Sequence, residues 1–150
     1  MCRWCSQQGA EGEWQEPVNQ GPQINTAASE FHFMEDRDAE WVYFTSGRPG
    51  GYGGADIWAS RHLGPNNWGP AVNLGPMVNN SGTDMCPAIG PDGKTLCWVS
   101  PSRADDSLGN ADIYWTYKSN IDLRTRSASA SRAGAATAVA APPQSEEHDH

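Results

Sequence analysis

Residues 45–60 have the sequence Thr-Ser-Gly-Arg-Pro-Gly-Gly-Tyr-Gly-Gly-Ala-Asp-Ile-Trp-Ala-Ser, and a degraded copy of this stretch occupies residues 99–116. The copy keeps a serine, an arginine and an Asp-Ile-aromatic triplet, but it loses most of the glycines. A phosphate-binding loop needs its glycines and a helix N-terminus directly after them. Here the triplet continues as a strand, so the stretch is interpreted as a tight connection between two β-strands.

The sequence around this stretch repeats with a period of 54 residues. The segment from Trp14 to Asn25 corresponds to the segment from Trp68 to Asn79, with Val, Asn, Gly and Pro at shared positions. A two-residue insertion then moves Asp56 onto Asp112. A repeat of this length, built from short strands and turns, predicts the blades of a β-propeller.

The expected fold class is all-β, with blades that are four-stranded antiparallel sheets in an incomplete propeller of about two blades. The divisions are the end of one blade in residues 1–25, a full blade in 26–76 and an incomplete blade in 77–122. Aromatic and β-branched residues on both faces of the strand at 41–45 predict a sheet covered on both sides. The expected strands are 31–34, 41–45, around 56–58, around 68–74, 85–89, 95–99 and 113–117.

The turn at Pro91-Asp92-Gly93-Lys94 is expected to join two strands so that Ala88 pairs with Cys97. In the first repeat Ala39 takes the place of Gly93, which costs about 1 kcal/mol if φ is positive there. From residue 123 the composition changes to Ser, Ala, Arg and Pro, and residues 123–150 are predicted to be a disordered low-complexity tail.

Composition excludes some partners. The chain carries 10 Lys and Arg against 18 Asp and Glu, a net charge of −8, so nucleic-acid binding is not expected. No apolar run approaches the roughly 18 to 20 residues that cross a bilayer, so no membrane insertion is expected. The first residues also lack the apolar stretch of a secretory signal, and the compartment stays open.

The pattern Trp-x-x-Pro-Val-Asn-x-Gly-Pro, followed by Ser-Gly-Arg-Pro-Gly-Gly-Tyr-Gly-Gly-Ala-Asp-Ile-Trp and later by Pro-Asp-Gly-Lys-Thr-Leu, resembles the WD40-like (PD40-like) propeller repeat of TolB. The same repeat occurs in envelope proteins with an OmpA-type domain. The resemblance covers about residues 1–118. It implies a β-propeller of the bacterial periplasm or cell envelope that binds a protein partner, without catalysis and without a cofactor.

Candidate binding residues lie in the loops at one end of the expected blades. They are Arg48, Tyr52, Arg103, Asn25 and Asn79. An Arg and an Asp flank the same connection in both repeats, as Arg48 with Asp56 and Arg103 with Asp112, so we expect each pair to pin its loop. The residues expected to mark the repeat structurally are Asp56, Trp58, Asp112, Tyr114, Trp14 and Trp68.

Metal and catalytic sites have little support in the sequence. Four oxygen-bearing residues form a weak calcium candidate, with a solvated turn as the alternative; they are Asp105, Asp106, Asn110 and Asp112. Cys2 and Cys5 form a C-x-x-C with no matching second pair, and Cys86 and Cys97 are expected to be buried thiols. No nucleophile, base or carboxylate pair stands out, so an enzyme is not expected.

Three functions remain open. The first is a non-enzymatic protein-interaction module, alone or as part of a longer envelope protein. The second is a glycan-binding or glycan-cleaving propeller that uses aromatic residues as stacking platforms. The third is a truncated reading frame without a function of its own. Because the last three expected strands lack a fourth, head-to-tail assembly of copies that completes a propeller is also expected.

Overall fold

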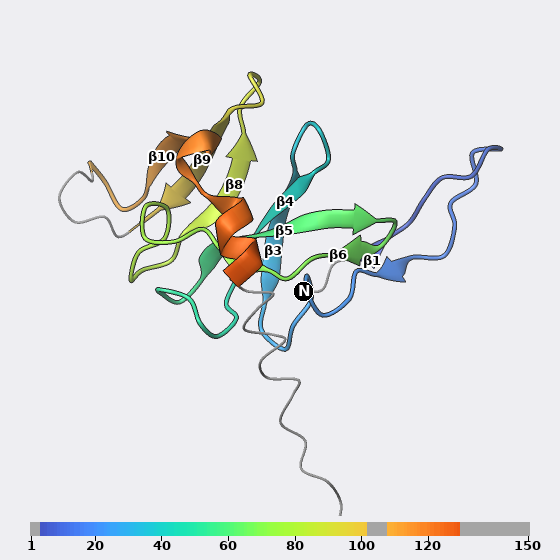
Figure 1. The fold of residues 1–150 in the computed structure, drawn as a ribbon, viewed down its shortest axis with the longest axis horizontal. Coiled ribbons are helices and arrows are strands. Elements are labelled where there is room, and N and C mark those ends of the chain that lie inside the picture. The colour runs from blue at the N-terminus through green and yellow to red at the C-terminus, as the bar shows by residue number, and fades with distance from the viewer. Residues whose placement is uncertain (1–3, 102–107, 130–150) are drawn as a thin grey trace, which may run out of the picture.

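The computed structural model describes residues 4–101 and 108–129, and in that part of the chain it contains three antiparallel sheets (Figure 1). We call them the N-terminal, middle and third sheets. The middle sheet has the order β3-β4-β5-β6, with β7 also paired to β5. The all-β expectation is confirmed. The strands are β1 (Trp4–Cys5), β2 (Val18–Asn19), β3 (Glu30–Glu35), β4 (Trp41–Ser46), β5 (Asp56–Gly64), β6 (Asn67–Trp68), β7 (Val72–Asn73), β8 (Met85–Ile89), β9 (Thr95–Ser100) and β10 (Asp112–Tyr117).

The strand expected around residues 68–74 is two short strands. β5 is nine residues long, and its far end pairs with β6 while Trp58 and Ala59 pair with β7. Gly69 and Pro70 lie between β6 and β7. Proline has no N–H for a ladder hydrogen bond, so the interruption follows from the sequence.

The repeat is visible in the backbone register. Trp4 pairs with Asn19 in the N-terminal sheet. Trp58 pairs with Asn73 in the middle sheet, 54 residues later in both strands. The strand pairing of the two copies therefore corresponds along with their sequences.

The hydrogen bonds that follow these strands also recur. Asn19 Oδ1 accepts hydrogen bonds from Gly21 N–H at 2.8 Å and from Asn25 Nδ2 at 3.1 Å. In the second copy Asn73 Oδ1 accepts the equivalent pair, from the residues two and six positions further along the chain. The turn after the asparagine strand thus has the same construction in both copies.

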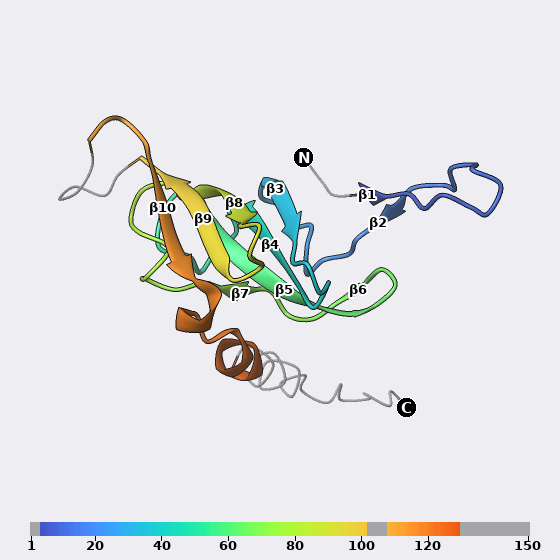
Figure 2. The same ribbon diagram turned by 90° about the horizontal axis from the view of Figure 1, so that it is seen from above.

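An apolar seam joins the middle sheet to the third sheet. Trp41, Tyr43, Ile57 and Ala59 lie on one face of the middle sheet and pack in a single buried cluster with residues of the third sheet and the segments beside it. The strands of the third sheet lie beside those of the middle sheet (Figure 2). The other buried members of this cluster are Val72, Leu74, Val78, Leu96, Trp98, Ile121 and Leu123.

The opposite face of the middle sheet carries a second apolar cluster. Val42, Phe44 and Trp58 pack there with Ile24, which precedes the sheet in the chain. Every residue of β4 is buried, so the expected two-sided apolarity of this strand is confirmed. In β10, by contrast, exposed residues alternate with half-buried ones.

The expected tail starts differently from the prediction. Residues 123–129 are helical, and Leu123 is buried in the seam. Asp122 Oδ1 accepts a hydrogen bond from Thr125 N–H, as an N-cap residue does, and hydrogen bonds from Thr125 hold the pKa of Asp122 below its usual value. Residues 130–150 lie outside the described part of the chain.

The turn between β3 and β4 holds a strained residue. Ala39 has φ of 54°, and Gly93, at the same position of the second repeat, has φ of 67°. We predict that Ala39→Gly raises the free energy of unfolding by about 1 kcal/mol, because glycine adopts this conformation without a steric penalty. Urea denaturation measures the change.

The matched control for this substitution is Gly93→Ala. It should lower the free energy of unfolding, because the new Cβ would have positive φ and would lie 3.2 Å from Cδ of Arg37. A lower stability for Ala39→Gly would show that Ala39 is not left-handed in solution.

Candidate functional site

The outer face of the third sheet carries large apolar residues that no other described element covers. Ile113, Trp115 and Tyr117 of β10 are 75%, 59% and 50% exposed. They pair across the ladder with Val99, Cys97 and Thr95 of β9. We call this surface the open face. Large apolar residues at the alternate positions 113, 115 and 117 are the signal for this face in the sequence, because alternate residues of a strand lie on one face of the sheet. The binding residues expected from the sequence all lay in loops instead.

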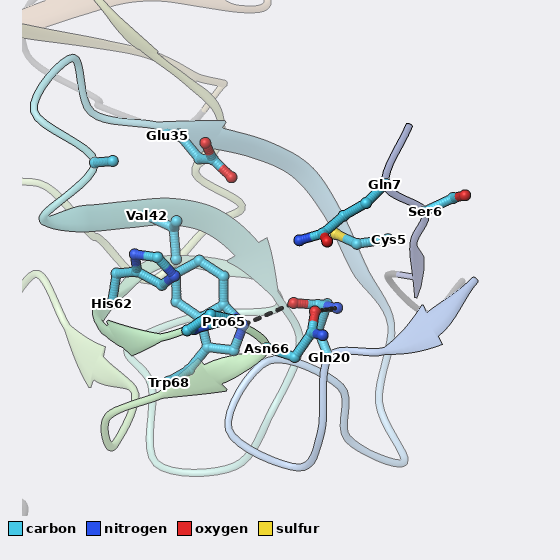
Figure 3. Close-up of a pocket in the computed structure, with 11 residues that line it drawn as sticks. Cys5, Ser6, Gln7, Gln20, Glu35, Val42, His62, Pro65, Asn66 and Trp68 are labelled. Atoms are coloured by element: carbon cyan, nitrogen blue, oxygen red, sulfur yellow. Dashed lines mark hydrogen bonds between the residues drawn. The ribbon is translucent and has the colours of Figure 1, made fainter. Parts of the chain in front are cut away.

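A cavity of about 410 Å³ lies at the other end of the molecule, between the N-terminal segment and the middle sheet (Figure 3). Its wall includes Trp68, whose indole N–H donates to Gln20 Oε1 at 2.9 Å. The Trp68 ring also contacts Phe33 and His62, with ring centroids 5.9 and 4.7 Å away. Other lining residues are Cys5, Gln7, Glu35, Val42 and Asn66.

The sequence predicted that Arg48 pairs with Asp56, and this prediction is wrong. Its guanidinium lies 3.6 Å from the Glu30 carboxylate and donates to the carbonyls of Gln23 and Ile24. The Arg48 side chain is only 8% exposed and lies over aromatic rings of the second apolar cluster. Burial lowers the pKa of Arg48, against the attraction of Glu30. The residue holds the β4–β5 connection to the preceding segment and is not displayed for a partner.

Asp56 fixes the glycine-rich connection by other means. Its carboxylate accepts hydrogen bonds from the N–H groups of Tyr52 and Gly53 and from Asn73 Nδ2. In the second repeat, Asp112 accepts from Leu108 N–H at 2.8 Å. The two aspartates therefore share the role of holding the loop before the strand. The other predicted loop arginine, Arg103, lies outside the described residues.

The remaining loop candidates differ in exposure. Asn79 is buried and bonds both the N–H and the carbonyl of Ile57, at 2.8 and 2.9 Å, so it is a structural residue. Asn25 is half-buried. Tyr52 is 49% exposed and is the loop candidate that is displayed among those the structure describes.

The aromatic residues of the repeat occupy different environments. Trp58 is buried, and Tyr114 stacks on Trp98 with ring centroids 6.2 Å apart. Trp68 is half-buried beside the cavity, whereas Trp14 is 70% exposed. Trp68 packs on a ring of β3, and in the described residues the N-terminal sheet has no counterpart of β3 to cover Trp14.

The described cysteines and carboxylates do not gather into a metal site. Cys5, Cys86 and Cys97 are free and half-buried, less covered than the sequence predicted for the last two. Cys86 Sγ lies 3.4 Å from His32 Nε2. Within residues 4–101 and 108–129, no group of three or more His, Cys, Asp and Glu could hold a metal ion. Of the metal-ligand candidates predicted from the sequence, three lie outside these ranges: Cys2, Asp105 and Asp106. A fourth candidate, Asn110, is exposed.

Comparison with family models, with curated proteins and with solved structures finds no match to this chain. In the part that the structure describes, no helix has the length and apolar character needed to span a membrane.

Glu30 provides a pH-dependent test of the Arg48 contact. Burial opposes ionisation of Glu30, but hydrogen bonds from Thr26 and Ser46 and the charge of Arg48 outweigh it and lower its pKa below the usual 4.5. A lowered pKa stabilises the folded state above pH 4.5, and this contribution is lost as the pH falls through the folded-state value. We predict that Glu30→Gln destabilises the protein at pH 7 and that the difference from the wild type shrinks below pH 4.5.

Urea denaturation from pH 7 down to pH 3 measures this difference. The control is Glu16→Gln, which changes an exposed carboxyl of the N-terminal segment and should have little effect. A difference for Glu30→Gln that is independent of pH would contradict the assignment.

Proposed function

We propose that this chain is a non-enzymatic protein-interaction module of the TolB-like β-propeller type, acting in the periplasm or cell envelope. The internal repeat, the hydrogen bonds that recur with it and the antiparallel sheets packed face to face support the propeller architecture. The open face supports the interaction role.

The main support for the interaction role is a difference in burial between the two repeats. Residues of the open face are exposed, whereas the residues at the equivalent positions of the middle sheet are buried. Ile113 and Trp115 correspond to Ile57 and Ala59, which are both 0% exposed. An isolated exposed apolar residue is ordinary, but several large ones on adjacent positions of one face indicate a binding surface. Aromatic residues such as Trp115 also contribute a large share of the energy at protein interfaces.

The glycan-binding alternative has weaker support from the cavity. A sugar stacks on a free aromatic face, and the Trp68 ring already contacts Phe33 and His62. Its indole N–H is also bonded to Gln20. The open face, lined by aliphatic and aromatic residues, suits an apolar protein surface better than a hydroxyl-rich ligand.

Site-specific photo-crosslinking in cells tests the proposal. A photoreactive phenylalanine analogue at Ile113 is expected to give a covalent adduct with a discrete protein, because this position lies on the open face. The same analogue at Leu63, a similarly exposed apolar residue of the middle sheet, is the control and should give far less of that adduct.

The identity of the adduct separates the hypotheses. A protein adduct at Ile113 supports the interaction role whether the partner is this chain or another protein. Absence of any protein adduct at the open face, together with binding on a glycan array, would overturn the proposal in favour of the glycan-binding alternative.

A further inference from the structure

We infer that Cys86 and His32 form a reactive thiol site, at which the sulfur of Cys86 exchanges with a low-molecular-weight disulfide and His32 acts as the base. The product is a mixed disulfide between Cys86 and one thiol of the small molecule. The two residues lie on edge strands, β8 of the third sheet and β3 of the middle sheet. The site is separate from the open face on β10, so the inference does not depend on the proposed interaction role.

The two residues occupy the same position of the repeat, 54 residues apart. Each lies at an irregularity of strand pairing, where the register shifts between Phe31 and Met34 in β3 and between Met85 and Ala88 in β8. A β-bulge leaves a residue out of the ladder and turns its side chain in a new direction. Because β3 and β8 lie side by side, the two irregularities bring together residues of different sheets (Figure 2).

The backbone of both residues is in the left-handed region. The φ angle is 53° at His32 and 56° at Cys86, a conformation that is unfavourable for residues other than glycine. Among the described residues, four that are not glycine have positive φ, and these two of the four contact each other. Such residues persist where the surrounding structure holds them in place, and they are concentrated at functional sites.

The contact joins a nucleophile to a base. The Sγ atom of Cys86 lies 3.4 Å from Nε2 and 3.5 Å from Nδ1 of His32, so a neutral imidazole has an acceptor nitrogen within reach in either tautomer. The thiolate is the nucleophilic form of cysteine, and a protonated histidine beside the sulfur stabilises its negative charge. Cys86 is half-buried and His32 is exposed, so the pair is open to solvent.

The exchange needs no group beyond the pair and the disulfide. His32 takes the proton of the Cys86 thiol, and the thiolate attacks one sulfur of the disulfide. A new bond joins that sulfur to Sγ, the disulfide bond breaks, and the second sulfur leaves with the electron pair. The imidazolium then donates its proton to the leaving thiolate. Cys86 is thereby oxidised to a mixed disulfide, and the leaving sulfur is reduced to a thiol.

A disulfide is the electrophile that this pair serves fully. Its exchange needs a base for the attacking thiol and an acid for the leaving thiol, and a single imidazole provides both. The site therefore matches a small disulfide such as oxidised glutathione, and a thiol in excess reverses the modification.

Cys97 is a control that the chain itself provides. It is free and half-buried like Cys86, and it lies in the same sheet. Its partners across the ladder are Ala88 and Trp115, not a histidine. A difference in reactivity between the two cysteines therefore reports on the contact with His32.

The experiment measures the rate at which oxidised glutathione forms a mixed disulfide with the reduced full chain, by mass spectrometry of tryptic peptides. Trypsin cleaves after Lys94, which separates Cys86 from Cys97. A free cysteine is only a few per cent thiolate at pH 7, so complete ionisation raises its rate by at most about 30-fold. We expect Cys86 to react about tenfold faster than Cys97.

His32→Asn tests the base. Asparagine adopts left-handed backbone more readily than most residues, so this variant keeps the backbone of β3 and removes the imidazole. The rate at Cys86 should fall about tenfold, and the rate at Cys97 should not change. The matched control is His62→Asn, which changes the other exposed histidine of the described residues and should leave both rates unchanged.

His32→Gly separates the chemical role of the imidazole from a structural one. Glycine adopts positive φ without strain and leaves room beside the sulfur. Free imidazole in the buffer should restore the rate at Cys86 in this variant and should not change the rate at Cys97. Circular dichroism melts confirm that each variant is folded.

Three results would overturn the inference. They are a wild type in which Cys86 reacts no faster than Cys97, a folded His32→Asn variant in which the rate at Cys86 is unchanged, and a loss of rate in His32→Gly that imidazole does not restore. None of these results bears on the photo-crosslinking at Ile113, so failure of this inference leaves the proposed interaction role in place.

Discussion

The burial of one face of the middle sheet against the third sheet is the contact on which the rest of the structure depends. It removes Tyr43, Ile57, Leu96 and Trp98 almost completely from water. Each fully buried large apolar side chain contributes about 1.5–3 kcal/mol, and this cluster is the larger of the two described in the chain. Tyr43 belongs to this contact, and burial, followed by the charge of Asp36, raises its pKa.

The same contact helps to explain the open face, to which we assign the function, and the position of the cavity. A sheet that is apolar on two sides needs a neighbour on each side. Among the described residues, the third sheet packs on the middle sheet with one side, and the open face is its other side. The cavity lies on the opposite side of the middle sheet, where the described N-terminal segment provides two short strands.

Much of the fold could be predicted from the sequence because it depends on local patterns. The turn chemistry around Gly93 predicts the pairing of Ala88 with Cys97, and this prediction is confirmed. The sequence left the sign of φ at Ala39 open, and the structure shows that it is positive. The partner of Arg48 could not be predicted from local patterns. Glu30 is distant from Arg48 in the sequence and comes beside it only when β3 pairs with β4.

Two other features escaped prediction for different reasons. The helix at residues 123–129 was missed because its Ser- and Ala-rich composition concealed the capping Asp122 and the buried Leu123. The cavity lies between the N-terminal segment and the middle sheet, and a local sequence pattern does not show which distant segments meet in the fold.

The path of the chain after β10 has a mechanical consequence. Lys118 pairs with Asp36, Leu123 enters the seam and Arg124 pairs with Glu40, so the chain crosses from the third sheet back onto the β3–β4 turn. A pulling force applied at residue 129 would first load these contacts with the middle sheet. Only after these contacts had broken would the force reach β10, so residues 118–124 protect the edge strand from tension.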